Sequence, residues 1–526
     1  MAQEQMRLAQ SELAANGGGK SVEGFLSETE VSMAKLDLEH RDLAAAAKML
    51  DAANGHMAGE HNSYHRREYA VARGLLELSQ GNPNTAEPML REALLEEERL
   101  AGKGGEGSIV LAQQDRELYA VLAGVWLAQG RSGKDVLSLW ERYRLRILGD
   151  TAPVCPKKGL DCLGPRLSAA LVRLGPNQLL GQVVLLDRLL LYKASGGDVV
   201  WKQVPVGSSE LLSTTAPLLL AVTSPATPMD AVDRAANRAG GILLSQLAQP
   251  EGSGGSRELL LEPDPLLGNL PWPAVASAAG PIGLEFDLEE SPTLLLNAGA
   301  DRGTASTTLG KSLVVGASVA SGEGQLLPEV LKEARAVARF GDDPNLLLAE
   351  QATESQVAAR LTTASTIHFA GHAAQQSGGT RLLLAPAKTA GMGLKDAIPD
   401  KPYLDSAMLR KYPPRAARLA VFSACSTGKK EEGWNHGMGD IVGTLASLGV
   451  PDVVATRWQI DSWSAVPMMD AFYGGLAQGL SVPQALTGAR QALMRDARYR
   501  HPYYWAAYYA SGSGRSDLRP IFHGSN

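Results

Sequence analysis

The feature that most constrains the fold of this chain is an alternation of short apolar runs with amphipathic segments, which begins near residue 313. Such alternation is typical of βα units, which build a parallel sheet covered by helices. We therefore expect an αβα sandwich in the C-terminal part of the chain. The expected strands are residues 313–316, 345–349, 366–370, 418–423 and 452–456. The expected helices are residues 328–340, 353–361, 404–412, 437–448, 463–478 and 482–496.

Two chemically active side chains follow the ends of expected strands. His372 comes directly after the run 366–371, and Cys425 comes directly after the run 419–424. In a parallel sheet, residues beyond the carboxyl ends of the strands form the crevice where ligands bind. A histidine and a cysteine on two such ends can meet, although 53 positions separate them in the sequence. Because a neighbouring imidazole makes a thiol an efficient nucleophile, the pattern predicts a cysteine–histidine dyad.

Length and composition limit the class of protein. A chain of 526 residues is too long for one hydrophobic core, so two or three domains are expected. A hydrophobic share of 44% and a charged share of 20% are ordinary for a soluble globular protein. The net charge of −6 gives no reason to expect a nucleic-acid or membrane-surface partner. No apolar run is long enough for a membrane span, and the start lacks an apolar signal core, so we expect a cytoplasmic protein.

The three cysteines do not form a disulfide scaffold, because three are too few for a chain of this length. Cys155 and Cys162 lie in a segment rich in proline, glycine and lysine. With no matching second pair, they are interpreted as incidental thiols and not as metal ligands. No metal and no organic cofactor is expected.

The first part of the chain is expected to be helical. Residues 1–27 are polar and are expected to be flexible, and residues 28–150 are rich in alanine, leucine and glutamate. Three helix–turn–helix units are expected, at 32–50, 69–95 and 117–145. The second resembles a degenerate tetratricopeptide (TPR) repeat through Ala70, Leu75, Gly81, Ala86, Leu90 and Ala93. A plain helical bundle is the alternative, and residues 151–174 are expected to form a linker.

The middle of the chain is expected to be rich in strands. Apolar runs at 182–186, 189–192 and 199–204 have hairpin spacing, and an amphipathic helix is expected at 228–247. Near the C-terminus, an aromatic group is interpreted as a helix packed on the sheet. It comprises Tyr503, Tyr504, Trp505, Tyr508 and Tyr509.

The segments around the predicted dyad resemble the CHAT domain, a family of caspase-like cysteine peptidases often found behind TPR repeats. Residues 367–372 (IHFAGH) resemble the family's histidine box, and residues 423–428 (SACSTG) resemble its nucleophile box. The resemblance continues through the segments at 264, 270–272, 327–334, 445–450, 453–458, 472–473 and 501–506. It covers about 175–515 and implies a caspase-like αβα sandwich, with an N-terminal part at 175–310 and a catalytic part at 311–526.

By this resemblance, Cys425 attacks a peptide carbonyl and His372 transfers the protons. The backbone amides of Cys425 and Ala373 would hold the developing oxyanion. The family usually has glycine where this chain has Ala373, which matters only if the position needs a positive φ. Asp461 is the nearest candidate for an acidic specificity residue of the kind that Arg-cleaving relatives such as separases use. It can equally cap the helix that follows it.

Other polar residues near the two boxes have simpler interpretations. His368 lies inside an expected strand and is expected to pack or bond locally. His436 is interpreted as a loop residue at the border of the cleft. A serine nucleophile, either Ser423 or Ser426, is poorly supported because neither lies in a Gly-x-Ser-x-Gly elbow.

The hypothesis from sequence is a cysteine endopeptidase that cleaves a specific protein substrate. The TPR-like helices are expected to receive an activating protein partner, and the resemblance extends to roles in bacterial defence or regulated cell death. The alternative is a catalytically inactive CHAT-fold scaffold, for which Ala373 gives a reason. Fold alone does not decide between them.

Overall fold

The computed structural model describes residues 20–57, 62–101, 114–148, 160, 162–245, 257–295, 311–318, 327–341, 343–376, 379–386, 402–424, 440–512, 518 and 522. The chain divides into two compact units. Unit 1 comprises Met1–Val172 and Gln182–Leu212, and unit 2 comprises Arg173–Gly181 and Ser213–Asn526. The expected hairpin strands near residue 182 therefore contribute to unit 1, although they follow the helical region in sequence.

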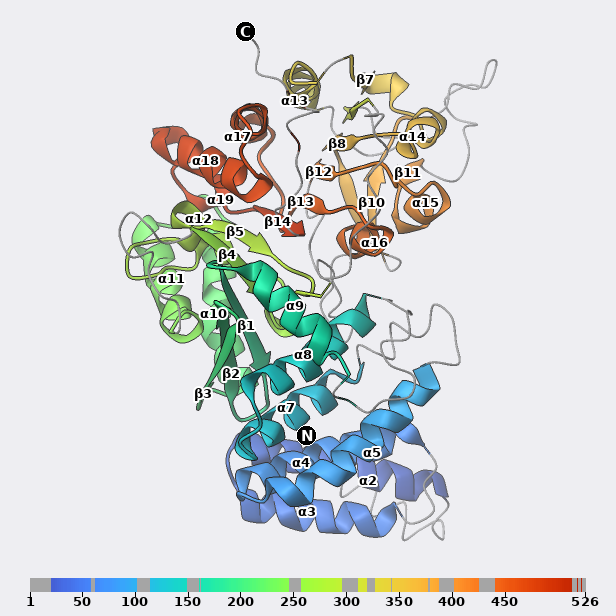
Figure 1. Cartoon of the computed structure of the whole chain (residues 1–526), viewed down its shortest axis with the longest axis vertical. Coiled ribbons are helices and arrows are strands. Elements are labelled where there is room, and N and C mark those ends of the chain that lie inside the picture. Colours follow the sequence, from blue (N-terminus) through green and yellow to red (C-terminus); the bar gives the residue numbers. More distant parts are fainter. Residues whose placement is uncertain are drawn as a thin grey trace. The chain divides into compact units, whose positions relative to one another are not determined.

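Unit 1 contains three successive pairs of antiparallel helices, coloured blue to cyan in Figure 1. They are α2 (Lys20–Glu39) with α3 (Leu43–His56), α4 (Ser63–Ser79) with α5 (Pro83–Ala101), and α7 (Arg116–Ala128) with α8 (Gly133–Ile147). The three expected helix–turn–helix units are thus confirmed. The second pair packs closely at Gly74 of α4, where an added Cβ would lie 2.8 Å from Leu90 Cδ1 of α5. The absence of a side chain at Gly74 therefore lets α5 approach α4 closely.

A β-hairpin completes unit 1. It joins β2 (Leu189–Ser195) to β3 (Asp198–Val204) in antiparallel register. The turn residues Gly196 and Gly197 both have positive φ, at 59° and 88°, as a type I′ turn requires. Trp201 donates its indole N–H to the Gly133 carbonyl at 2.9 Å, which fastens the hairpin to the start of α8.

Two features differ from the expected linker at 151–174. Residues Gly164–Leu174 form a helix, α9, because its apolar positions recur at helical spacing and Leu167, Ala170, Leu171 and Leu174 are buried. Cys162 is disulfide-bonded, and its partner lies outside the described residues. The interpretation of Cys162 as an incidental thiol is therefore wrong.

Unit 2 is built on a twisted sheet with the strand order β1-β4-β5-β14-β13-β12-β8-β6-β7. Of β1, it holds residues 178–181, which pair in parallel with β4. The strands are β1 (Gln178–Val184), β4 (Glu258–Glu262), β5 (Asp287–Glu290), β6 (Leu313–Ala317), β7 (Asn345–Leu348), β8 (Thr366–Gly371), β12 (Leu419–Ala424), β13 (Asp452–Thr456) and β14 (Tyr508–Gly512). All described neighbours are parallel except β13 and β14. A smaller antiparallel sheet contains β9 (Ala373–Gln376), β10 (Gly379–Leu383) and β11 (Tyr403–Leu404).

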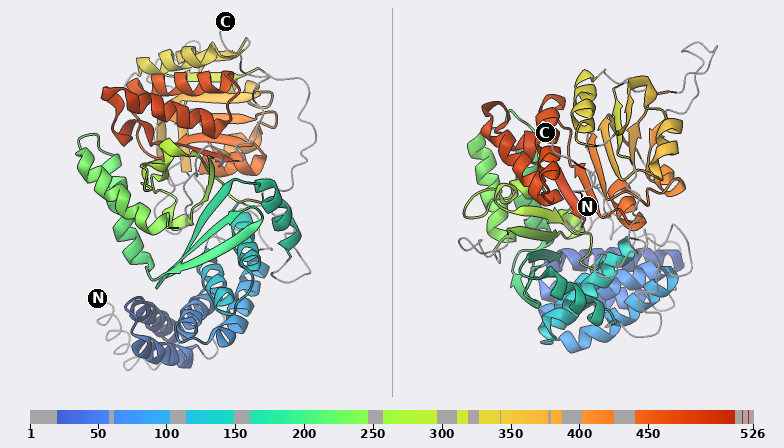
Figure 2. Two further views of the ribbon diagram at one scale, coloured as in Figure 1. Left: turned by 60° about the vertical axis from the view of Figure 1, so that its left-hand side comes forward. Right: turned by 45° about the horizontal axis from the view of Figure 1, so that its top comes forward.

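Helices cover both faces of this sheet (Figures 1 and 2). One face carries α14 (Glu354–Leu361), α15 (Ser406–Lys411) and α16 (Asp440–Leu448), whose apolar side chains join Val315, Phe369 and Phe422 in one core. The other face carries α13 (Pro328–Ala338), α17 (Ser462–Ala477) and α18 (Val482–Arg495). Every residue of β6, β8, β12 and β13 is buried, as expected for strands covered on both sides. The expected αβα sandwich is confirmed.

The remaining helices of unit 2 are α10 (Ser208–Val222, which begins in unit 1), α11 (Met229–Leu243), α12 (Ile282–Glu285) and α19 (Pro502–Trp505). The interpretation of the C-terminal aromatic group as a single helix is wrong. Only Tyr503, Tyr504 and Trp505 are helical, whereas Tyr508 and Tyr509 belong to β14. Within the part of the chain that the structure describes, no helix has the length and apolar character needed to cross a membrane.

Candidate functional site

The carboxyl ends of β8 and β12 lie side by side in the sheet. The register pairs Gly371 with Ala424, the last residues of the two strands. On the other side of β8, Gly371 pairs with Ala317 of β6. Neighbouring strands in a sheet lie about 4.8 Å apart. The chain therefore leaves the sheet at two adjacent points, one residue before His372 and one residue before Cys425.

His372 lies where the chain passes from the large sheet into the small one. It is half-buried between β8 and β9, and its carbonyl accepts a hydrogen bond from the Leu383 amide at 2.9 Å. This bond ties the histidine backbone to β10. The imidazole is thus carried by a fixed main chain at the edge of the sheet.

Ala373 is the first residue of β9, and its amide points away from β10. The register places Ala373 opposite Leu382, while Leu383 bonds the neighbouring residue His372. In an antiparallel pair, hydrogen-bonded and non-hydrogen-bonded positions alternate, so Ala373 occupies a non-hydrogen-bonded position. Its φ is not positive, since Arg41, Asp343 and Ala349 are the described non-glycine residues with that conformation. Alanine therefore fits this backbone without strain.

Cys425 and the segment 425–439, with Ser426 and His436, lie outside the described residues. The structure does describe the residue before the cysteine. The Ala424 carbonyl accepts a hydrogen bond from the Thr456 hydroxyl at the end of β13. This bond fixes the peptide group that leads out of β12.

Asp461 caps α17. Its Oδ2 accepts a hydrogen bond from the Ser464 amide at 2.8 Å, and its carbonyl accepts one from the Ser464 hydroxyl at 2.9 Å. Of the two roles considered from sequence, the structure therefore shows the cap. The side chain is half-buried, and within the described residues its second oxygen, Oδ1, accepts no hydrogen bond.

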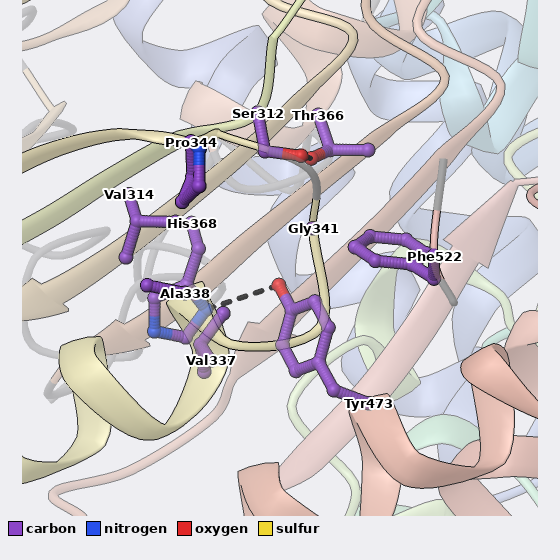
Figure 3. A pocket seen from close by; sticks show the side chains of 10 residues that line it. All are labelled: Ser312, Val314, Val337, Ala338, Gly341, Pro344, Thr366, His368, Tyr473 and Phe522. Carbon is purple, nitrogen blue, oxygen red and sulfur yellow. Dashed lines mark hydrogen bonds between the residues drawn. The ribbon is translucent and has the colours of Figure 1, made fainter. Parts of the chain in front are cut away.

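His368 belongs to the core, as the sequence predicts. It is 1% exposed, and its Nδ1 lies 3.2 Å from the Tyr473 hydroxyl (Figure 3). Its Nε2 lies 3.3 Å from Glu333 Oε1, an ion-pair distance without hydrogen-bond geometry. Burial, with the added repulsion of Glu333, raises the pKa of Tyr473, so its hydroxyl stays protonated. The pocket around these side chains leaves no room for a water molecule, so it is a packing defect and not a ligand site.

Sequence reasoning missed a buried ion pair near the same edge. Arg457 directly follows β13, is 3% exposed, and pairs with Glu290 of β5. Its guanidinium lies 4.0 Å from the centre of the Tyr509 ring. A charged residue directly after an all-buried strand was the available signal, because a buried arginine needs a carboxylate partner. The partner itself, 167 residues earlier, could not be identified from the sequence.

Ser423 is not an accessible nucleophile. It is 3% exposed within β12, and its hydroxyl is hydrogen-bonded to the Tyr508 hydroxyl at 3.0 Å. The described residues also include no group of three or more His, Cys, Asp or Glu side chains placed to hold a metal ion.

Comparison with known proteins identifies the family. The sequence model of the CHAT domain matches residues 233–513, more than half of the chain. No curated protein matches the chain. The crystal structure of the Saccharomyces cerevisiae separase–securin complex at 3.0 Å is similar with a TM-score of 0.50 and 10% identity, and the match covers 96% of this chain and 48% of that chain. A second crystal structure of the complex, at 2.6 Å, gives a TM-score of 0.46 and 9% identity, with 97% and 48% covered.

The chain thus spans about half the length of the solved chain that it matches. At this level of identity the likeness shows the fold, which is caspase-like, and nothing further. The family match covers β4 to β14, including both segments that carry the predicted dyad. This chain therefore belongs to the CHAT domain family.

Proposed function

We propose that the chain is a cysteine endopeptidase that uses His372 and Cys425 to cleave a protein substrate. The observation that carries the proposal is the pairing of Gly371 with Ala424, since one further step along each strand reaches the two proposed catalytic residues. The family match supports it, because the matched residues contain both.

The proposed chemistry is covalent catalysis in two steps. His372 takes the thiol proton of Cys425, and the thiolate attacks the scissile carbonyl to form a C–S bond. The imidazolium then gives its proton to the leaving amine as the C–N bond breaks. Water, deprotonated by His372, hydrolyses the thioester and restores the thiol. The supporting geometry is the strand spacing of about 4.8 Å, which brings residues at equivalent positions within side-chain reach.

The Ala373 amide is proposed as a donor to the oxyanion, together with the amide of Cys425. Its support is the direction of the Ala373 N–H away from β10, which leaves it out of that strand pairing. A donor of this kind is worth roughly 3–4 kcal/mol of transition-state stabilisation in other enzymes. Because Ala373 has an ordinary φ, the absence of glycine gives little support to the inactive-scaffold alternative.

Asp461 is proposed to favour a basic residue before the scissile bond through its Oδ1. The cap and the specificity role can be separated by two substitutions. Asp461→Asn keeps a good helix cap but removes the charge, whereas Asp461→Ala removes both. We expect Asn to preserve the unfolding midpoint and reduce kcat/KM for basic substrates relative to neutral ones. If wild type and the Asn variant show the same ratio of kcat/KM between basic and neutral substrates, this role is refuted.

The decisive test of the peptidase is labelling of the full chain with irreversible peptidyl electrophiles of varied sequence. We expect a mass shift on Cys425 that disappears in Cys425→Ala and falls sharply in His372→Ala. Arg335→Gln, an exposed change on α13 in the same unit, serves as the folding and labelling control. If no electrophile labels Cys425, even with candidate protein partners present, the result favours the inactive scaffold.

Regulation by a protein partner is proposed for the three helix pairs of unit 1, interpreted as TPR-like. The matched separase was solved in complex with securin, which gives a precedent for a similar fold in complex with another protein.

A cytoplasmic location and a role in defence or regulated cell death complete the proposal. Co-expression with proteins encoded next to this chain, comparing wild type with Cys425→Ala, tests it. Toxicity or phage protection that is identical in both would refute a role for proteolysis.

A further inference from the structure

A polar cavity in unit 1, open to solvent at the exposed side chain of Arg41, has no role in the proposed peptidase. Its volume is about 250 Å³, and it lies among the turn between α2 and α3, the end of α4, and the two ends of the β-hairpin. Its polar lining consists of Arg41, Ser79, Asp187, Arg188 and Gln203. Its apolar lining consists of Leu38, Leu43 and Pro205.

Arg41 adopts a backbone conformation that is unfavourable for arginine. Its φ is 61°, and it occupies the second position after the end of α2. The equivalent positions of the next two helix pairs are Gly81, with a φ of 82°, and Gly130, with a φ of 76°. Glycine adopts this left-handed conformation without steric cost, and other residues do not. Two of three equivalent turns therefore use the favoured residue, and the third places a guanidinium at the cavity. Strain of this kind is a reason to look for a function.

The two arginines of the cavity have different partners. Arg188 is bound by both carboxylate oxygens of Asp187, at 2.9 and 3.0 Å from its Nε, and its Nη2 donates to the Ser79 hydroxyl at 2.9 Å. Arg41 donates from Nη2 to the Pro205 carbonyl at 3.2 Å. Within the described residues, Arg41 Nε and Nη1 and Arg188 Nη1 donate no hydrogen bond.

The charges of the cavity do not balance. Asp187 offsets Arg188, and the lining offers no carboxylate to Arg41, so the lining carries one net positive charge. A ligand with one negative charge would balance the charge of the lining. A carboxylate has this charge, and its two oxygens match the planar donors of a guanidinium. A phosphate dianion fits less well, because Asp187 faces the same space. The small volume and the apolar side chains match a carboxylate with a short aliphatic part.

We propose that this cavity is a binding site for a carboxylate with an adjoining aliphatic group, held by Arg41 with support from Arg188. The same chemistry is present in a small organic acid, in the C-terminus of a peptide and in an acidic side chain. The site is independent of the proposed dyad, so failure of either proposal leaves the other standing.

Binding is tested on the full chain by saturation-transfer difference NMR with three probes. N-acetyl-leucine carries a terminal carboxylate, its amide carries none, and N-acetyl-glutamic acid α-amide carries a side-chain carboxylate. We expect saturable transfer to one or both acids and none to N-acetyl-leucine amide. The preferred acid distinguishes a terminal carboxylate from a side-chain carboxylate. Equal transfer to the neutral amide, or no transfer to either acid, would overturn the proposal.

Arg41→Gly is the informative substitution, because glycine is favoured at this φ. The variant should keep or raise the unfolding midpoint while its affinity for the acids falls by roughly ten-fold or more, the loss expected for a charged hydrogen bond. Arg99→Gln, on the exposed surface of α5, should bind as wild type does. Unchanged binding by Arg41→Gly would refute the site. A lowered midpoint would show that Arg41 is kept for its bond to Pro205, which also overturns the proposal.

Discussion

Two adjacent glycines in α11 are expected to respond in opposite ways to the same substitution. An added Cβ on Gly240 would lie 1.8 Å from the Ala276 carbonyl oxygen. An added Cβ on Gly241 would meet nothing within 4 Å. The two positions share one helix, so the change in helix propensity is nearly the same. Their comparison therefore isolates the effect of packing.

The magnitudes follow from these distances. Gly241→Ala should stabilise the protein by about 0.5 kcal/mol, because alanine lowers the entropy lost on helix formation. Gly240→Ala gains the same term but must push the Ala276 backbone away by more than 1 Å. Overpacking costs about 1–3 kcal/mol. The movement also breaks the hydrogen bond from the Ala276 amide to the Ala236 carbonyl, worth about 1 kcal/mol. The net loss is about 2–3 kcal/mol.

Thermal and urea unfolding of the full chain measure the difference. Because the chain has two units, the midpoint of the transition that reports unit 2 is compared, without assuming a single two-state process. The expected order of midpoints is Gly241→Ala, wild type, then Gly240→Ala. If Gly240→Ala unfolds at or above the wild-type midpoint, the close approach of α11 to Ala276 is incorrect.

Three further predictions concern buried charges and the disulfide. Arg457→Met should cost about 3–5 kcal/mol in unfolding experiments, because it leaves Glu290 buried without its partner, and adding Glu290→Leu should recover most of the loss. Burial raises the pKa of Asp115 from 3.8 to about 7, so the folded state holds its proton more tightly and stability should fall as pH rises from about 4 to 7. Asp115→Asn should flatten that part of the stability profile, and an unchanged slope would contradict the assignment. Non-reducing peptide mapping should pair Cys162 with Cys155, a short loop worth about 2 kcal/mol, and should find the proposed nucleophile as a free thiol.

The C-terminal half of the fold could be predicted because its strands are continuous apolar runs. Strands buried on both faces must be apolar throughout, so β6, β8, β12 and β13 are visible in the sequence without knowledge of their neighbours. The position of His372 follows from the end of β8. Pairings between distant segments were not predictable, since nothing near Tyr509 indicates that it lies beside β13.

In the candidate site, too, the sequence predicted local features but not contacts between distant segments. The role of Asp461 as a cap was one of two local possibilities, and a local hydrogen bond shows it. The ion pair of Arg457 depends on a residue in another strand, so its partner could not be inferred from the sequence around it. The strained turn at Arg41 was equally hidden, because only the backbone shows that it matches Gly81. Local hydrogen bonds such as a helix cap could thus be predicted from the sequence, whereas contacts between strands could not.

The position of β14 has a consequence for biosynthesis. This strand lies between β13 and β5, so residues 508–512 join the two sides of the sheet in unit 2. A ribosome that has not yet delivered them leaves β5 and β13 with exposed edges, which are prone to aggregate. The nascent chain therefore cannot complete this sheet until residues 508–512 have left the ribosomal exit tunnel.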